Sequence, residues 1–211
     1  MEQEDQEINI IQEETKMTSK EKMLRLINQS SDQECQDILD IVTFHKVKYA
    51  RGTLANMLRM AQTYADNNST CRKTHVGCFL IAEDQWRTVL AKGTNHGEED
   101  CRQVGCLREE VFGDNSKTHR ATCRCAKCHS EIDALNNVAP VYKHKLKGAT
   151  AIVTRYPCIN CAKALVEAGI TQIFWGREFP LEPETEAYLE AHNITYMHIR
   201  GVIQDENDKN N

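Results

Sequence analysis

The chain has 211 residues, of which 40% are hydrophobic and 27% charged, with a formal net charge of −5. This is typical of one soluble globular domain with extensions, and no run approaches the roughly 18 apolar residues of a membrane span. Residues 1–20 hold six acidic residues and two lysines, a net charge of −4. The remainder is nearly neutral and lacks a broad basic surface, which disfavours a nucleic-acid partner. The acidic N-terminus does not resemble a secretion signal, so we expect a cytoplasmic protein without a membrane partner.

Three segments are expected along the chain. Residues 1–48 form an acidic tail followed by a helical extension, residues 49–200 a globular domain, and residues 201–211 a polar tail. The first 18 residues have too few apolar side chains to fold alone, so we expect them to be disordered. Apolar positions between residues 23 and 44 predict two short amphipathic helices, the second capped by Ser31 or Asp32.

An alternating pattern of helices and strands fills the globular domain. The predicted elements are helix 53–66, strands 75–82 and 88–93, helix 129–138, strand 149–154, helix 158–168, strand 171–175, helix 183–192 and strand 194–199. Such alternation predicts a mixed, mostly parallel sheet with helices on both faces, a three-layer α/β/α fold. A loop of about 30 residues interrupts the pattern after residue 93, which is long for a plain connection in a compact domain.

Ten cysteines without a secretion signal indicate metal ligands or reactive thiols rather than a disulfide framework. Five of them fall within 28 residues, from Cys101 to Cys128, and two others form the Cys-x-x-Cys pair of Cys158 and Cys161. Such clustering is typical of metal coordination, and we expect cysteines to anchor the long loop.

Two short motifs indicate a catalytic zinc ion. Cys158 and Cys161 follow Pro157, which stiffens the first turn of a helix, and a helix N-terminus favours the thiolates that zinc binds. His129, from the His-x-Glu motif, would complete three protein ligands and leave the fourth position for water, as in catalytic zinc sites. Glu131 lies two residues beyond His129, near the metal without binding it.

Water activated at such a site loses a proton near neutral pH. Glu131 can take that proton and deliver it to a pyrimidine ring nitrogen and then to the leaving ammonia. The ordered pair of His-x-Glu and Pro-Cys-x-x-Cys is the signature of zinc nucleobase deaminases. Two alternatives stay open: a closed four-ligand zinc that includes Cys128, and a redox role for Cys158 and Cys161, which would leave the His-x-Glu motif unexplained.

The chain resembles the deoxycytidylate (dCMP) deaminase family of the cytidine deaminase-like fold over about residues 50–200. Besides the two zinc motifs, the matching segments are Ser69-Thr70-Cys71 with Val76-Gly77, Gly93-Thr94-Asn95 with Gly97, Cys101 with Gly105-Cys106-Leu107-Arg108-Glu109, and Cys161-Ala162-Lys163 through Ala168-Gly169-Ile170. The resemblance implies hydrolysis of dCMP to dUMP and ammonia, which supplies thymidylate synthesis. It also implies that Asn95 contacts the sugar or base, that the protein is a homo-oligomer, and that nucleoside triphosphates are candidate effectors. Candidates for the phosphate contact are Arg72, Lys73 and Arg155.

The resemblance further implies a second, structural zinc that pins the long loop. Its expected ligands are Cys71, Cys101, Cys106 and Cys125. Cys123 and His119 are alternatives for the fourth ligand, and a set of reduced, partly buried thiols is the alternative to a metal.

Two departures from the family pattern leave the choice of nucleotide open. Asp133 stands where the family usually has asparagine, and His96 replaces a small residue after Asn95. Other functions therefore remain: deamination of another cytidine nucleotide or nucleoside, or editing of nucleic acid, for which 6% aromatic residues and a neutral domain are unfavourable. A non-catalytic zinc-binding interaction module is the alternative outside enzymes, and Glu131 argues against it.

Overall fold

The computed structural model describes Tyr49, residues 51–85, 87–113, 123, 128–177 and 183–203, together with scattered positions between residues 18 and 35. The chain divides into two units, residues 1–46 and 47–211. The predicted tails lie almost wholly outside the described residues. Within the described parts, no helix has both the length and the apolar character that crossing a membrane requires.

In the first unit, Ser31 begins a helical turn as the sequence predicts. Its backbone N–H donates to Glu34 Oε2 at 2.8 Å, and the Glu34 N–H donates to Ser31 Oγ at 3.3 Å. This reciprocal pair is a capping box, which satisfies two backbone donors at a helix start.

The second unit is built on a five-stranded mixed sheet with the order β2-β1-β3-β4-β5. Strand β1 (Gly77–Ile81) pairs antiparallel with both β2 (Val89–Thr94) and β3 (Thr150–Val153), the central strand of the sheet. Strands β3, β4 (Gln172–Trp175) and β5 (Thr195–His198) are parallel. Every residue of β1 and β3 is buried, as expected for strands covered on both faces.

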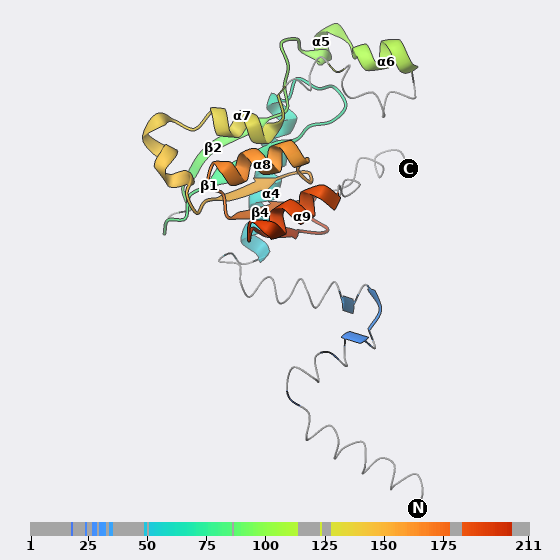
Figure 1. Ribbon diagram of the computed structural model, residues 1–211. Coiled ribbons are helices and arrows are strands. Elements are labelled where there is room, and N and C mark those ends of the chain that lie inside the picture. The colour runs from blue at the N-terminus through green and yellow to red at the C-terminus, as the bar shows by residue number, and fades with distance from the viewer. Residues whose placement is uncertain are drawn as a thin grey trace, which may run out of the picture. The chain divides into compact units, whose positions relative to one another are not determined.

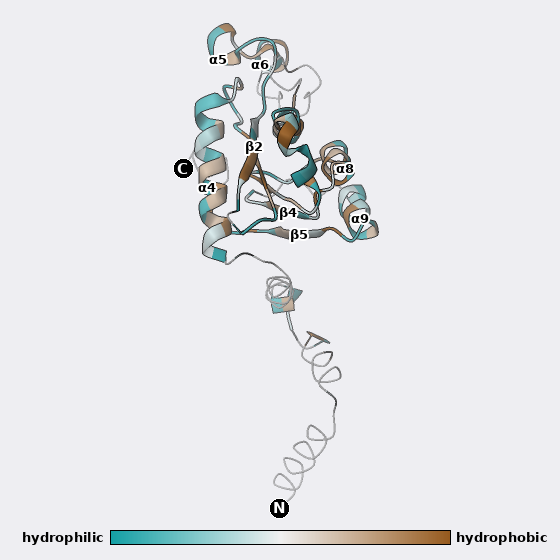
Figure 2. Ribbon diagram, turned by 90° about the vertical axis from the view of Figure 1, so that its left-hand side faces the viewer, coloured by the Kyte–Doolittle hydropathy of each residue, from teal (hydrophilic) through white to brown (hydrophobic). Residues whose placement is uncertain are grey.

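Helices cover both faces of this sheet, which confirms the predicted three-layer α/β/α fold. Helix α4 (Arg51–Asn68) packs on one face, while α7 (Ser130–Asn136), α8 (Ile159–Glu167) and α9 (Pro183–Ala191) lie on the other (Figure 2). These bounds agree with the predicted helices and strands to within a few residues. Alternation along β1 directs successive side chains to the two layers.

Two glycines let helices approach the sheet closely. A Cβ atom on Gly77 would lie 2.3 Å from the Ala61 carbonyl oxygen of α4, and one on Gly93 would lie 2.2 Å from both the Ala134 nitrogen and the Ser130 oxygen of α7. No residue with a side chain fits at these separations. The glycine of β2 therefore fixes where α7 begins, and with it the residues at the start of that helix.

The long loop, for which the sequence predicts no helix, is not wholly irregular. It contains two short helices, α5 (Cys101–Val104) and α6 (Leu107–Phe112), which lie at one end of the domain beyond α7 (Figure 1). Asp100 caps α5 by accepting the Arg102 N–H at 2.9 Å. A further 3-10 helix, η3 (Pro140–Leu146), precedes β3. With four and six residues, α5 and α6 are too short to show a helical period in sequence.

Candidate catalytic metal centre

Three candidate metal ligands meet where α7 and α8 begin. His129 and Cys158 are the residues immediately before these helices; both have extended backbones, and neither side chain caps its helix. Cys161 lies in the first turn of α8. Because α7 and α8 pack against each other, His129 Nδ1 lies 3.6 Å from Cys158 Sγ and 3.4 Å from Cys161 Sγ.

These separations fit a zinc ion. Usual Zn–S and Zn–N bonds at a tetrahedral angle place sulfur and nitrogen about 3.6 Å apart. All three donor atoms of His129, Cys158 and Cys161 lie within 4.8 Å of one another. The group offers three protein ligands, so a tetrahedral ion held here would have one position open to water or substrate.

Cys128 is not part of this group, although it adjoins His129 in sequence. Among the described residues, its donor atom instead groups with those of His96 and Asp133. Successive side chains of an extended backbone point to opposite sides, and His129 has such a backbone. The alternative of a closed four-ligand site completed by Cys128 is therefore wrong for this conformation.

A hydrogen bond between the two thiols of the group shifts their pKa values in opposite directions. A hydrogen bond from Cys161 lowers the pKa of Cys158 to about 4, helped by His129. The same hydrogen bond raises the pKa of Cys161, and burial raises it further. A metal ion that displaces the proton of this hydrogen bond would meet two thiolates, the form in which cysteine binds zinc.

Glu131 lies beside the group but outside it. Its side chain is 4% exposed, and burial raises the pKa of its carboxyl. The Ser130 hydroxyl donates to Glu131 Oε2 at 2.9 Å, while His129 and Cys158 are close enough to influence the same carboxyl electrostatically. This arrangement suits a group that exchanges protons near the metal rather than binding it. The sequence analysis did not predict the contact from Ser130.

The side chain of Asn95 is held by three neighbours. Its Oδ1 accepts hydrogen bonds from Ser69 Oγ at 2.9 Å and from the Val76 N–H at 2.8 Å, and its Nδ2 donates to the Thr74 carbonyl at 3.0 Å. A primary amide has two N–H donors, so this network leaves a second N–H of Nδ2 for another acceptor. Asn95 is thus both a structural residue and a preoriented donor.

The predicted second metal site is described only in part. Cys125 and His119 lie outside the described residues. Cys101 and Cys106 are 1% and 5% exposed, which is unusual for residues of a surface loop, and Cys71 is half-buried.

Cys123 lies near Cys71, Cys101 and Cys106. Burial raises the pKa of its thiol, and the thiols of Cys71, Cys106 and Cys101 raise it further, against the opposing charge of Arg108. Among the described residues, these four sulfur atoms do not all lie within 4.8 Å of one another. They converge on one region without forming a closed set of ligands.

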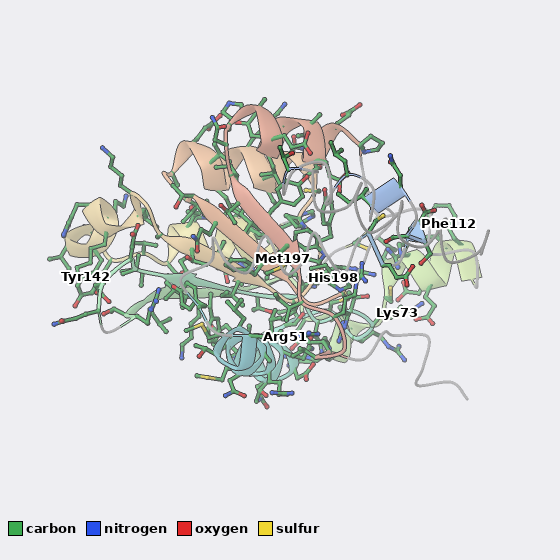
Figure 3. The ribbon with its side chains drawn as sticks, turned by 90° about the horizontal axis from the view of Figure 1, so that it is seen from below. Arg51, Lys73, Phe112, Tyr142, Met197 and His198 are labelled. Atoms are coloured by element: carbon green, nitrogen blue, oxygen red, sulfur yellow. The ribbon has the colours of Figure 1, made fainter. Side chains whose placement is uncertain are left out.

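Two of the candidate phosphate contacts, Arg72 and Lys73, face a carboxylate of α6. Lys73 Nζ lies 3.1 Å from Glu109 Oε1 of α6, and Arg72 Nη1 lies 4.0 Å from the other oxygen of that carboxylate. Figure 3 shows Lys73 at the same end of the domain as Phe112 of α6. Arg155 follows β3 and is half-buried. Two of the three candidates therefore share a carboxylate partner in this conformation.

The family model of the cytidine and deoxycytidylate deaminase zinc-binding region matches residues 52–177. ComE operon protein 2 of Bacillus subtilis is 26% identical over 142 residues, which are 66% of this chain and 68% of that protein. The deoxycytidylate deaminase of Saccharomyces cerevisiae is 28% identical over 134 residues, and that of Mycobacterium phage D29 is 30% identical over 121. These matches cover 63% and 55% of this chain, and 40% and 88% of the two relatives.

Among solved structures, the chain is similar to the dCMP deaminase of cyanophage S-TIM5 in complex with dCMP and dUMP. The two are 17% identical, with a TM-score of 0.47, and the match covers 68% of this chain and 93% of the phage protein. The family model spans both motifs of the metal group and the strands and helices that carry them. The chain belongs to the cytidine and deoxycytidylate deaminase family, whose members carry this zinc-binding region.

Proposed function

We propose that this protein hydrolyses dCMP to dUMP and ammonia, with a zinc ion held by His129, Cys158 and Cys161. The observation that carries the proposal is the group of three metal donors beside the buried carboxyl of Glu131. Two relatives named deoxycytidylate deaminase, at 28% and 30% identity, support dCMP as the substrate.

The reaction replaces the exocyclic amino group of cytosine with the oxygen of water. Bound zinc supplies a Lewis acid that lowers the pKa of water at its open position. Glu131 takes the proton of the attacking water and transfers it to the ring nitrogen next to the reacting carbon. It then carries a second proton to the amino group, so that one water is consumed and one ammonia leaves. Burial of Glu131 keeps its protons from exchanging freely with solvent.

Asn95 would orient the nucleotide. The three hydrogen bonds that hold its amide lower the entropic cost of binding, because the donor is already in position. The remaining N–H of Nδ2 is suited to an acceptor on the sugar or base. Assembly into a homo-oligomer and regulation by nucleoside triphosphates stay predictions.

A second zinc would anchor the loop between residues 95 and 127. The burial of Cys101 and Cys106 and their nearness to Cys71 and Cys123 support this proposal. Cys123, which lies near Cys71, Cys101 and Cys106, is a candidate for the fourth ligand beside Cys125, which lies outside the described residues.

A substrate panel tests the proposed function. Purified protein is assayed with dCMP, deoxycytidine, CMP, dCTP and short single-stranded DNA, following ammonia release and the ultraviolet change from cytosine to uracil. A charge-assisted phosphate contact is worth about 1.5–3 kcal/mol, so kcat/KM for dCMP should exceed that for deoxycytidine about ten- to a hundredfold. Equal values for these two would indicate a nucleoside deaminase, and preferential turnover of DNA would indicate an editing enzyme.

A further inference from the structure

We propose that His96, Cys128 and Asp133 form a further metal site, which binds a thiophilic divalent cation such as Zn²⁺. This group shares no residue with the catalytic one or with the set of Cys71, Cys101, Cys106 and Cys123. Its three donor atoms lie within 4.8 Å of one another, as do those of the catalytic group. The proposal does not depend on which nucleotide the protein deaminates.

A short backbone pairing brings two of these residues together. His96 and Cys128 form an isolated antiparallel bridge, in which each backbone N–H donates to the other's carbonyl, at 3.1 and 3.0 Å. Directly paired residues of an antiparallel bridge place their side chains on the same face. Cys128 is therefore directed toward His96, while the next residue, His129, turns its ring to the catalytic group.

Asp133 supplies the third donor from the first turns of α7. Its Oδ1 lies 3.2 Å from His96 Nε2, and its Oδ2 accepts the Thr94 N–H at 2.9 Å. Asn137 Nδ2 also donates to Oδ1, at 3.1 Å. A carboxylate held in this way is already oriented, as the carboxylates that bind metals in proteins usually are.

The chemistry of the donors selects the class of cation. One imidazole, one thiol and one carboxylate suit zinc and similar transition metals, whereas magnesium and calcium take oxygen ligands. Usual zinc bonds place the nitrogen and oxygen about 3.3 Å apart, close to the 3.2 Å between His96 and Asp133. All three residues are partly exposed, so water can fill a fourth position.

Two departures from the family pattern, taken together, create this site. His96 replaces a small residue and Asp133 an asparagine, and the structure brings the two into contact. An ion here would tie the segment after β2 to α7. It would thereby hold two flanking residues in place, Asn95 on one strand of the bridge and His129 on the other. Since the site is half-exposed, its affinity for Zn²⁺ should be lower than the affinity of the catalytic group for Zn²⁺.

The test is a metal titration of the protein that retains its tightly bound zinc. Zn²⁺ is added in steps and counted by elemental analysis after removal of free ion, and Co²⁺ serves as a spectroscopic probe of thiolate ligation. The wild type should bind one further equivalent, with a thiolate-to-cobalt absorption band. In Cys128→Ala the band and the equivalent should be lost, and in His96→Gly or Asp133→Asn the affinity should fall at least tenfold.

A matched control comes from a second histidine–aspartate pair. His75 Nδ1 lies 3.0 Å from Asp66 Oδ1, but this pair has no place in any group of three metal donors among the described residues. His75→Gln should leave the titration unchanged. Asp133→Asn keeps an oxygen for the Thr94 N–H, and thermal melts together with the retained zinc verify that each variant is folded.

The proposal is overturned if wild type and Cys128→Ala bind the same number of equivalents with the same spectrum. It is also overturned if His96→Gly and Asp133→Asn bind as tightly as the wild type, since His96 and Asp133 would then form an ordinary hydrogen-bonded pair. A protein that fails to deaminate dCMP but shows the expected titration would refute only the proposed function.

Discussion

Replacing Glu131 with glutamine should abolish deamination while leaving the catalytic metal in place. Glutamine has nearly the same shape, and its amide oxygen can still accept the hydrogen bond that Ser130 donates at 2.9 Å. The three metal donors do not include Glu131, so the variant keeps every ligand. What it loses is the ability to accept a proton from water and release it to the substrate.

The size of the loss follows from burial. Glu131 is 4% exposed, so bulk water cannot readily take its place as a proton carrier. A positioned general acid–base group contributes about 100-fold or more to the rate. A 100-fold loss corresponds to about 2.7 kcal/mol of transition-state stabilisation. We expect kcat to fall by at least this factor.

Metal content and dCMP turnover are measured on the same preparations of wild type and Glu131→Gln. Glu167→Gln is the matched control, because Glu167 is an exposed carboxylate at the end of α8. It should leave both quantities unchanged. If Glu131→Gln keeps a tenth or more of the wild-type rate at equal zinc, Glu131 is not the proton carrier.

Three further predictions concern the packing, the substrate contact and the loop. Gly93→Ala forces a Cβ atom to within 2.2 Å of the α7 backbone, so it should destabilise the fold by about 1–3 kcal/mol or more and reduce the zinc content. The control variant Gly52→Ala has open space around its Cβ atom and should have the melting temperature of the wild type. Asn95→Ala removes the acceptor of two buried hydrogen bonds, which should cost about 1–3 kcal/mol in thermal melts and raise KM for dCMP; an unchanged KM would exclude substrate contact. Cys101→Ser or Cys106→Ser should lower both zinc content and melting temperature without removing the catalytic zinc, and elemental analysis that shows no loss would refute the structural site.

The regular elements of the domain were predictable because their patterns are strong and local. The apolar spacing along residues 53–66 and the buried runs around residues 78 and 151 identify helix and strands without tertiary information. The catalytic group was predictable for a related reason. Its two motifs each lie at the start of a predicted helix, so the residue types and their order indicate a shared metal.

The features that the sequence did not predict depend mainly on contacts between distant segments. The bridge between His96 and Cys128 joins residues 32 positions apart, and neither residue carries a local signal of the other. Asp133 and His96 were visible in the sequence only as two separate departures from the family pattern. Helices α5 and α6 escaped prediction because four and six residues are too few to show a helical period; α5 buries only Cys101, and α6 buries none of its residues.

Removal and return of zinc test the central proposal most directly. Protein is stripped with a chelator, assayed with dCMP, and assayed again after Zn²⁺ is restored to the amount originally bound, with dUMP and ammonia both quantified. The account predicts loss of turnover on stripping, recovery on the return of zinc, and equal amounts of the two products. Turnover that persists in the stripped protein, or none after zinc is restored to a folded chain, would contradict it.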